Sequence, residues 1–180
     1  GAISIRHMKA CLAHQTEPSC AASLIRGTQM HSFVWDNEEF KKHYHVTDLD
    51  FRTKAGKEFL AENNITSADC IKPDVYEEYV QARKNVENHP ALRALNGIFN
   101  IEPEKEIYWT YESDSGEVNC KARLDGLNSE YILEYKTTQN LDTFELQITK
   151  LHYYLQVAWY FEAVRQLTGK ELPVIMVAQE

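Results

Sequence analysis

The sequence lacks closely spaced cysteines and any recognisable linker. Its four cysteines, Cys11, Cys20, Cys70 and Cys120, lie far apart and form no C-x-x-C motif. This spacing excludes a zinc knuckle and a thioredoxin-like redox pair, and a domain of this size needs no disulfide, so free thiols are expected. No repeat and no Gly-, Ser- or Pro-rich stretch divides the chain, so we expect one domain over residues 1–180.

The sequence has fewer basic residues than acidic ones, and it has no long apolar run. The 27 acidic and 19 basic residues give a net charge of −8, which argues against a simple basic coat protein for nucleic acid. An enzyme that holds DNA in one groove through bound metal ions is compatible with this charge. The longest apolar runs, 157–161 and 172–178, are too short to span a membrane, and residues 1–13 lack the apolar core of a secretory signal. These absences predict a cytoplasmic protein without membrane contact.

Helical patterns fill the first hundred residues. Asp74 and Glu77 form a capping box, Pro90 suits a first helical turn, and Gly97 suits a helix end. The polar, aromatic segment 37–50 separates the second expected helix from the third. Helices are expected over residues 4–13, 20–35, 53–63, 74–88 and 90–97.

In the second half of the chain the period of apolar residues changes to two. Strands are expected over residues 106–111, 117–125, 131–136 and 172–178. The last is an apolar run that fits a buried strand lying parallel to its predecessor after a helical crossover. The order predicts an α/β domain with a central mixed β-sheet flanked by helices. Its mainly helical part spans 1–100, and its β-β-β-α-β core spans 104–180.

One long helix is expected before the last strand. Asp142 with Glu145 forms its capping box, and Gly169 ends it. Its core-facing apolar stripe comprises Ile148, Leu151, Leu155, Ala158 and Phe161. A neighbouring polar stripe at four-residue spacing comprises His152, Gln156 and Tyr160. This second stripe can lean towards the strand ends, although an ordinary amphipathic boundary is the alternative.

Two carboxylates and a lysine meet in the predicted hairpin. Asp125 ends one strand, and Glu134 and Lys136 share a face of the next, because side chains two apart point the same way. Pairing of these strands would place Asp125 beside Glu134. Such a hard oxygen site suits Mg²⁺ or Mn²⁺, with the Tyr135 backbone carbonyl as a further ligand. Lys136 beside that ion could orient or deprotonate a water or stabilise a developing phosphorane, as phosphodiester hydrolysis requires.

Each part also has an ordinary structural explanation. An E-x-K pair on a strand is usually a solvated face or a cross-strand ion pair, and Asp-Gly is ordinarily a turn. Here Ile132 flanks the charges on their own face, while Tyr131, Leu133 and Tyr135 fill the other. Charges on a strand that is apolar on both faces are costly unless they bind something, which favours a functional site.

Three segments resemble the PD-(D/E)XK nuclease superfamily. They are R-L-D-G at 123–126, E-Y-K-T-T at 134–138 and Q-V-A-W-Y at 156–160, which matches a Q-x-x-x-Y helix motif. Within the superfamily the chain is similar to the RecE-type recombination exonucleases (exodeoxyribonuclease VIII) and the YqaJ-type phage exonucleases. Further similar blocks lie at 27–31, a G-x-x-x-H helix, and at 52–57 and 104–109. Leu124 stands where the signature has Pro, a residue that shapes the turn and ligates nothing.

The resemblance implies a restriction-endonuclease-like core and metal-dependent 5′-to-3′ digestion of double-stranded DNA. The product would be 3′ single strands for recombination. The implied metal ligands are His31, Asp125 and Glu134, and the implied catalytic lysine is Lys136. The residues implied to position the scissile strand or the active-site groups are Gln156 and Tyr160. Glu106 is a weaker candidate for an acidic residue near the site.

The resemblance also implies partners. A ring-like homo-oligomer that encircles double-stranded DNA would compensate for the acidic charge, and a single-strand annealing protein is the expected companion. Arg52, Lys54 and Lys57 form the densest basic cluster and are expected to face the DNA backbone, with a solvated helix face as the alternative. Such proteins usually continue beyond the last strand, so a C-terminus truncated at Glu180 is also expected.

Three other functions stay open. A structure-specific or sequence-specific endonuclease would use the same chemistry. A catalytically silent nuclease-fold module would bind DNA or a recombination partner, but the complete Asp-Glu-x-Lys set argues against silence. A purely structural phage or host interaction protein gives no reason for a glutamate and a lysine on so apolar a strand.

Overall fold

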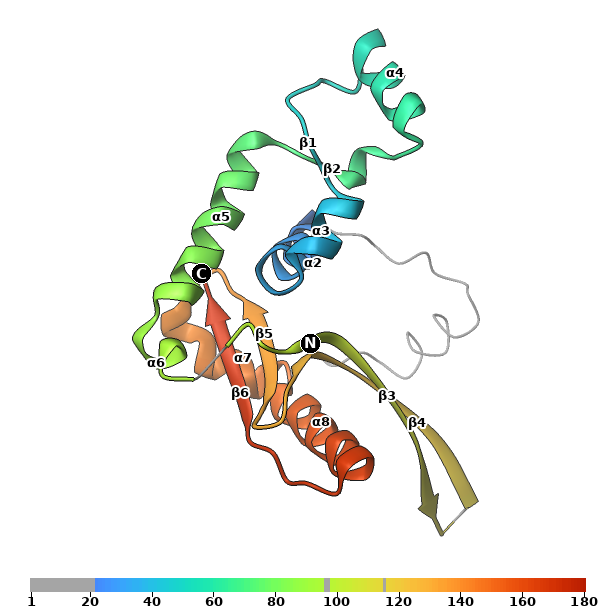
Figure 1. Ribbon diagram of the computed structural model, residues 1–180, viewed down its shortest axis with the longest axis vertical. Coiled ribbons are helices and arrows are strands. Elements are labelled where there is room, and N and C mark those ends of the chain that lie inside the picture. The colour runs from blue at the N-terminus through green and yellow to red at the C-terminus, as the bar shows by residue number, and fades with distance from the viewer. Residues whose placement is uncertain (1–21, 96–97, 115) are drawn as a thin grey trace. The chain divides into compact units, whose positions relative to one another are not determined.

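The computed structural model describes residues 22–95, 98–114 and 116–180 (Figure 1). The chain divides into two compact units, a helical unit within Cys20–Ile98 and a sheet unit that contains Phe99–Glu180. The helix expected over 4–13 lies outside the described residues, as does Gly97, the residue expected to end the helix that begins at Pro90. Among those residues, no helix combines the length and the apolar character needed to cross a membrane.

The helical unit contains four of the expected helices. Three have boundaries close to those predicted, whereas the helix expected over 90–97 ends early, at Arg93. Its elements are α2 (Ala22–Trp35), α3 (Asn37–His43), β1 (His45–Val46), α4 (Lys54–Asn63), η1 (Ser67–Asp69), β2 (Cys70–Ile71), α5 (Pro73–Asn88) and α6 (Pro90–Arg93). Strands β1 and β2 pair in parallel. The core of the unit is aromatic, with the Phe33 and Phe40 rings edge to face at 4.9 Å. The buried Tyr79 hydroxyl donates a 2.9 Å hydrogen bond to Gln29 Oε1.

Two local predictions in this unit were wrong. The segment 37–50 contains helix α3, which starts there because the Asp36 carboxylate accepts a hydrogen bond from the Glu39 amide. The capping box proposed at Asp74 does not start α5. Pro73 occupies the first helical position, where its fixed φ suits the helix and its missing N–H costs nothing.

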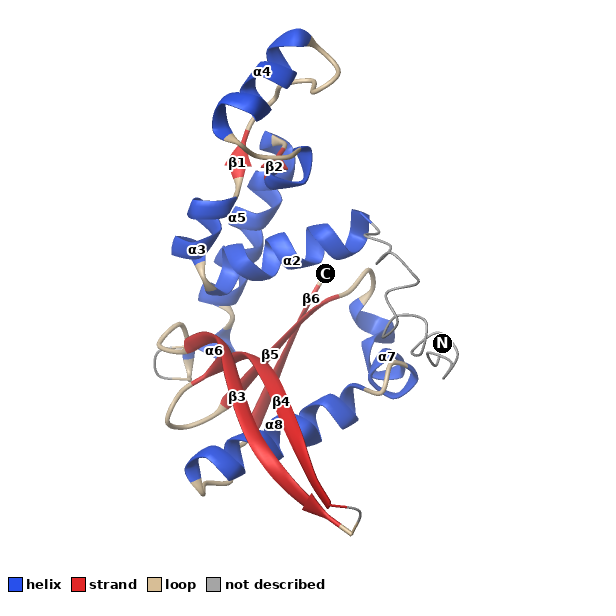
Figure 2. Cartoon of the chain, turned by 90° about the vertical axis from the view of Figure 1, so that its right-hand side faces the viewer, coloured by secondary structure: helices blue, strands red, loops and turns tan. Residues whose placement is uncertain are grey.

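The sheet unit is built on four strands, β3 (Glu102–Ser113), β4 (Gly116–Leu127), β5 (Ile132–Thr137) and β6 (Val174–Gln179). Their spatial order is β3-β4-β5-β6, with the first two pairings antiparallel and the last parallel. The expected mixed sheet and its parallel final strand are therefore confirmed. Helix α8 (Tyr153–Thr168) packs against β3, β4 and β5 and supplies the crossover to β6 (Figure 2).

The long helix expected before β6 is instead two helices. After η2 (Leu141–Thr143), α7 (Phe144–Lys150) ends and α8 begins on the far side of His152, whose φ of 57° is left-handed. The Asn140 side chain, rather than Asp142, caps the first turn by accepting a hydrogen bond from the Thr143 amide. Gly169 ends α8 with a φ of 70°, as predicted.

The predicted apolar stripe was also wrong. The left-handed residue His152 separates the start of the stripe from its end, and within α8 the face that carries Leu155 and Ala158 is exposed. Leu151 and Leu155 are 46% and 59% exposed. The residues of α8 that enter the core with Leu124 and Ile132 are Tyr160, Ala163 and Val164.

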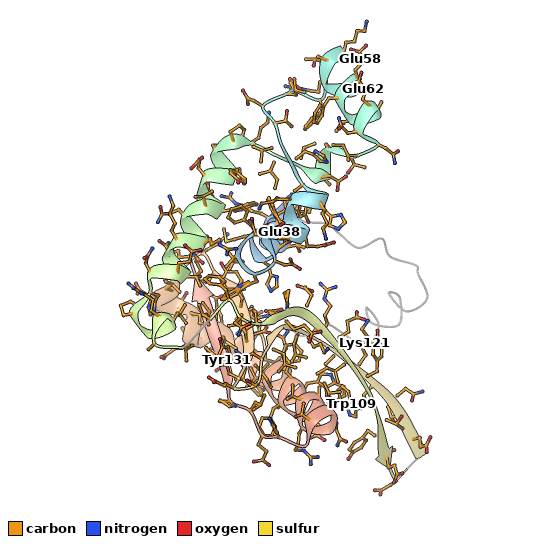
Figure 3. The ribbon with its side chains drawn as sticks, in the orientation of Figure 1. Glu38, Glu58, Glu62, Trp109, Lys121 and Tyr131 are labelled. Carbon is orange, nitrogen blue, oxygen red and sulfur yellow. The ribbon has the colours of Figure 1, made fainter. Side chains whose placement is uncertain are left out.

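The long β3–β4 hairpin is tied to α8 by tryptophans. The Trp109 and Trp159 rings lie 4.9 Å apart, and Trp159 Nε1 donates a 3.1 Å hydrogen bond to the Lys121 carbonyl. Trp109 and Lys121 both lie along the hairpin (Figure 3). Helix α8 therefore holds the sheet through the hairpin as well as through the central strands.

Two leucine-to-alanine substitutions test which side chains build this core. Leu124→Ala removes a fully buried side chain and should lower the free energy of unfolding by about 2–5 kcal/mol. Leu155→Ala, at a position predicted to face the core but in fact exposed, should change it by no more than about 0.5 kcal/mol. Urea denaturation followed by tryptophan fluorescence measures both. A larger loss for Leu155→Ala would contradict this placement of α8.

Candidate active site

Strands β4 and β5 separate at the two predicted carboxylates. Gly126 pairs with Leu133, and the ladder stops at the next position, where Asp125 lies opposite Glu134. In place of a further ladder bond, Asp125 Oδ2 accepts a 2.7 Å hydrogen bond from the Tyr135 N–H. The structure thus brings together the two carboxylates that the sequence placed in one hairpin.

Gly126 lies within β4 and not in a turn, because β4 continues to Leu127. A Cβ atom at this position would come within 2.5 Å of the Ile101 Cδ1 atom and 3.3 Å of the Leu133 Cβ atom. The Ile101 methyl group is the end of a flexible side chain and can move, whereas the approach to Leu133 Cβ is tighter than ordinary van der Waals contact. Glycine therefore suits the close packing of β4 next to Asp125, and Asp-Gly does not form the turn that is its ordinary structural explanation.

Glu134 is the most enclosed charged group of the site. Its side chain is 0% exposed, and Oε1 forms an ion pair with Lys136 Nζ on the same face of β5. Among the residues that the structure describes, none donates a hydrogen bond of good geometry to either Glu134 oxygen. Burial, reinforced by the neighbouring Asp125 carboxylate, raises the pKa of Glu134 to about 7, although Lys136 acts in the opposite direction.

Glu104 is a third acidic residue beside these carboxylates, and the sequence did not single it out as a candidate ligand. It faces Asp125 in the β3–β4 register, between the pairs Pro103–Gly126 and Lys105–Leu124, and its φ of 51° takes it out of the ladder. One carboxylate oxygen of Glu104 lies within 4.8 Å of one from Asp125.

The register of the hairpin could have identified Glu104. The turn at 113–116 fixes the pairing, and counting back along both strands puts Glu104 opposite Asp125. The candidate named from the sequence, Glu106, is instead an exposed residue that pairs with Lys121 at 2.6 Å and accepts a hydrogen bond from the Tyr108 hydroxyl.

Helix α8 contributes two of the three residues of the predicted polar stripe. Gln156 Nε2 donates a 2.8 Å hydrogen bond to the Tyr160 hydroxyl. Burial and, after it, the negative charge of Glu134 raise the pKa of Tyr160 to about 12, so its phenol stays protonated at neutral pH. His152 does not continue the stripe. It occupies the left-handed break before α8, and its Nδ1 lies 2.9 Å from the Tyr154 hydroxyl.

The remaining predicted residues lie in the helical unit. His31 is on α2, and its role as a metal ligand stays a prediction. Arg52 precedes α4 and pairs with Asp50 at 2.8 Å, while Lys54 and Lys57 lie in the first turns of α4. Helix α4 also carries Glu58 and Glu62 (Figure 3), and Lys54 Nζ lies 3.6 Å from Glu58 Oε1.

The sheet residues fit a hard divalent cation. Asp125, Glu134 and Glu104 offer carboxylate oxygens, the donors that Mg²⁺ and Mn²⁺ prefer. The buried Glu134 carboxylate lies beside a second carboxylate, and a cation would relieve their repulsion. The free thiols of Cys70 and Cys120 take no part in this acidic group.

The raised pKa of Glu134 predicts how stability depends on pH when no metal is bound. The folded protein keeps this proton up to about pH 7, whereas the unfolded chain releases it near 4.5. The free energy of unfolding should therefore fall between these pH values, by up to about 3 kcal/mol from this group. In EDTA, Glu134→Gln should remove that fall, so the variant gains stability relative to the wild type as pH rises.

Glu106→Gln provides the matched control for this measurement. Glu106 is exposed and its pKa is lowered by hydrogen bonds from Lys121 and Tyr108, so its loss cannot reproduce the gain at neutral pH. Urea denaturation at pH values from 4.5 to 8 gives the comparison. A wild type and a Glu134→Gln variant whose stabilities change in parallel would show that Glu134 is not buried in its charged form.

The sequence also matches the model of a known protein family. The family described as "PDDEXK-like domain of unknown function (DUF3799)" matches residues 3–180. No curated protein matches the chain. The four-stranded mixed sheet with its packed helices is consistent with the restriction-endonuclease-like fold of PDDEXK proteins, and membership supports divalent-metal-dependent phosphodiester hydrolysis of DNA as the general activity. With nearly its whole length matched, the chain belongs to this PDDEXK-like family and thus to the PD-(D/E)XK superfamily.

Proposed function

We propose that the protein is a metal-dependent deoxyribonuclease that digests double-stranded DNA from 5′ to 3′ and leaves 3′ single strands for recombination. The observation that supports hydrolysis best is the fully buried Glu134 beside Asp125 and Lys136, at the point where β4 and β5 separate. At this buried position an apolar residue would stabilise the fold better than a carboxylate does, so a functional role explains the glutamate. We also propose that both units form one nuclease domain, which the match over residues 3–180 supports.

The roles of the residues follow from the chemistry of phosphodiester hydrolysis. Bound Mg²⁺ or Mn²⁺ would supply Lewis-acid stabilisation of the charged phosphoryl oxygens and lower the pKa of a water. Asp125 and Glu134 would hold it, with Glu104, His31 and the Tyr135 carbonyl as further candidates. Lys136 would orient the water that attacks phosphorus. As that water loses a proton and its oxygen bonds to phosphorus, the phosphorus–oxygen bond opposite breaks and the leaving oxygen takes up a proton from solvent.

Helix α8 would position the scissile strand. Gln156 and Tyr160 are hydrogen-bonded to each other, and the Tyr160 phenol remains a neutral donor beside two carboxylates. A neutral hydroxyl can donate to a phosphate or to a water, whereas a phenolate would add a further negative charge. Both residues therefore suit positioning and not proton abstraction.

The polarity and the partners of the reaction rest on the resemblance to RecE-type and YqaJ-type exonucleases. A ring-like homo-oligomer around the duplex would retain DNA in spite of a net charge of −8. A single-strand annealing protein would receive the 3′ strands, and a phage or prophage setting would fit such a pair. A structure-specific or sequence-specific endonuclease, or a silent binding module, is the alternative that the first experiment separates.

That experiment compares linear and covalently closed circular duplex DNA, with Mg²⁺ and with EDTA. Metal-dependent loss of linear DNA alone is the expected result. Glu134→Gln and Lys136→Ala should each lower the rate by about 100-fold or more, because they remove groups that act on developing charge. Glu106→Gln, an exposed glutamate on the same sheet, should leave the rate unchanged.

Other outcomes of this experiment would reject parts of the proposal. Cutting of closed circles would indicate an endonuclease, and binding of DNA without any cutting would indicate a silent module. Full activity of a folded Lys136→Ala protein would remove the role assigned to the lysine. Labelling of the 5′ or the 3′ end of linear DNA then gives the polarity.

A separate prediction concerns the basic cluster of Arg52, Lys54 and Lys57. If these side chains face the DNA backbone, replacing all three with Gln should make the plot of log affinity against log salt less steep, by up to about 2.7 at about 0.9 per phosphate contact. Lys41 and Lys42, which pair with Glu38 and Glu39 on α3, provide the control pair. An unchanged slope in the triple variant would assign the cluster to a solvated helix face.

A further inference from the structure

Lys136 has an aromatic neighbour that lies outside the residues already assigned to the site. Its Nζ atom lies 4.9 Å from the centroid of the Tyr153 ring, at the first residue of α8. The Lys136 side chain is 19% exposed and also forms the ion pair with Glu134. We infer that Tyr153 is a positioning residue for Lys136, whose ammonium it holds over its ring face.

Tyr153 is itself held from several directions. The left-handed backbone at His152 ends α7 and places Tyr153 at the start of a new helix, half-buried against β5. Its ring lies 6.2 Å from that of Phe144, the first residue of α7. Gln147 Nε2 donates a 2.9 Å hydrogen bond to Thr138 Oγ1, which joins α7 to the end of β5. The break between the helices therefore serves to place this ring.

A lysine in this position needs a second contact. Its four-carbon chain is flexible, and holding it in one rotamer costs about 2 kcal/mol of side-chain entropy. The ion pair with Glu134 alone would draw the ammonium to the carboxylate that is proposed to hold the cation. A ring face attracts a partly desolvated ammonium without accepting a conventional hydrogen bond from it, so the N–H groups that are not directed at Glu134 stay available for water or phosphate.

This role rests on the proposed function, and substitutions at Tyr153 test it. Tyr153→Leu keeps an apolar side chain but removes the ring face. It should lower kcat by about 5- to 30-fold with little change in KM, the range for a cation–π contact. Tyr153→Phe keeps the ring and should restore most of this loss. Tyr111→Leu, the same change at an exposed tyrosine on β3 that is away from the helix break, is the matched control.

A second measurement does not depend on cleavage. In protein labelled with ¹³C-lysine, the ε-methylene signal of Lys136, assigned by its loss in Lys136→Arg, should be shifted upfield by the Tyr153 ring. The shift should persist in Tyr153→Phe and disappear in Tyr153→Leu. An unshifted signal in a protein that cleaves DNA would overturn the positioning role alone, as would equal losses of kcat in Tyr153→Leu and Tyr153→Phe. A shifted signal in a protein that cleaves no DNA would overturn the proposed function and this role with it.

Discussion

An ionised carboxylate loses most of its hydration when it is buried, and Glu134 has no exposed surface on the central strand β5. Asp125 lies next to it and adds repulsion, while Lys136 supplies the opposing charge. The Tyr135 N–H is turned to Asp125 and so fixes one carboxylate at the edge of the gap between the strands. The fold thus encloses a carboxylate whose negative charge it balances only in part, as the raised pKa of Glu134 shows, and a bound cation would complete the balance.

The two halves of α8 contact different parts of the sheet unit, the apolar core and the charged group around Glu134. Towards its C-terminal half the helix packs Ala163 and Val164 on the apolar part of the sheet. Towards its N-terminal half it carries Gln156 and Tyr160. The Tyr160 hydroxyl accepts a hydrogen bond from Gln156 and lies near the Glu134 carboxylate. One helix thus changes from apolar to polar contacts within about two turns. The same helix therefore anchors the fold and carries two residues of the candidate site.

The strand order, the parallel last strand and the meeting of Asp125 with Glu134 could be predicted, because alternation and hairpin pairing are local patterns. The break at His152 could not, since the apolar period runs through it and nothing in the sequence forbids a continuous helix. The position of Glu104 opposite Asp125 could have been counted from the hairpin register, but its left-handed backbone inside a strand could not, since no propensity indicates it. The contact between Tyr153 and Lys136 depends on that same helix break, so both were missed together.

Position 104 has a left-handed backbone, which favours glycine, and it carries a carboxylate, which glycine lacks. Glycine would adopt this φ without the cost of about 1 kcal/mol or more that a side chain brings there, yet glycine has no carboxylate. If Glu104 holds a cation as proposed, selection for stability alone should favour glycine at position 104, whereas selection for cation binding should favour an acid. Position 104 would then be one where thermal tolerance and activity demand different residues.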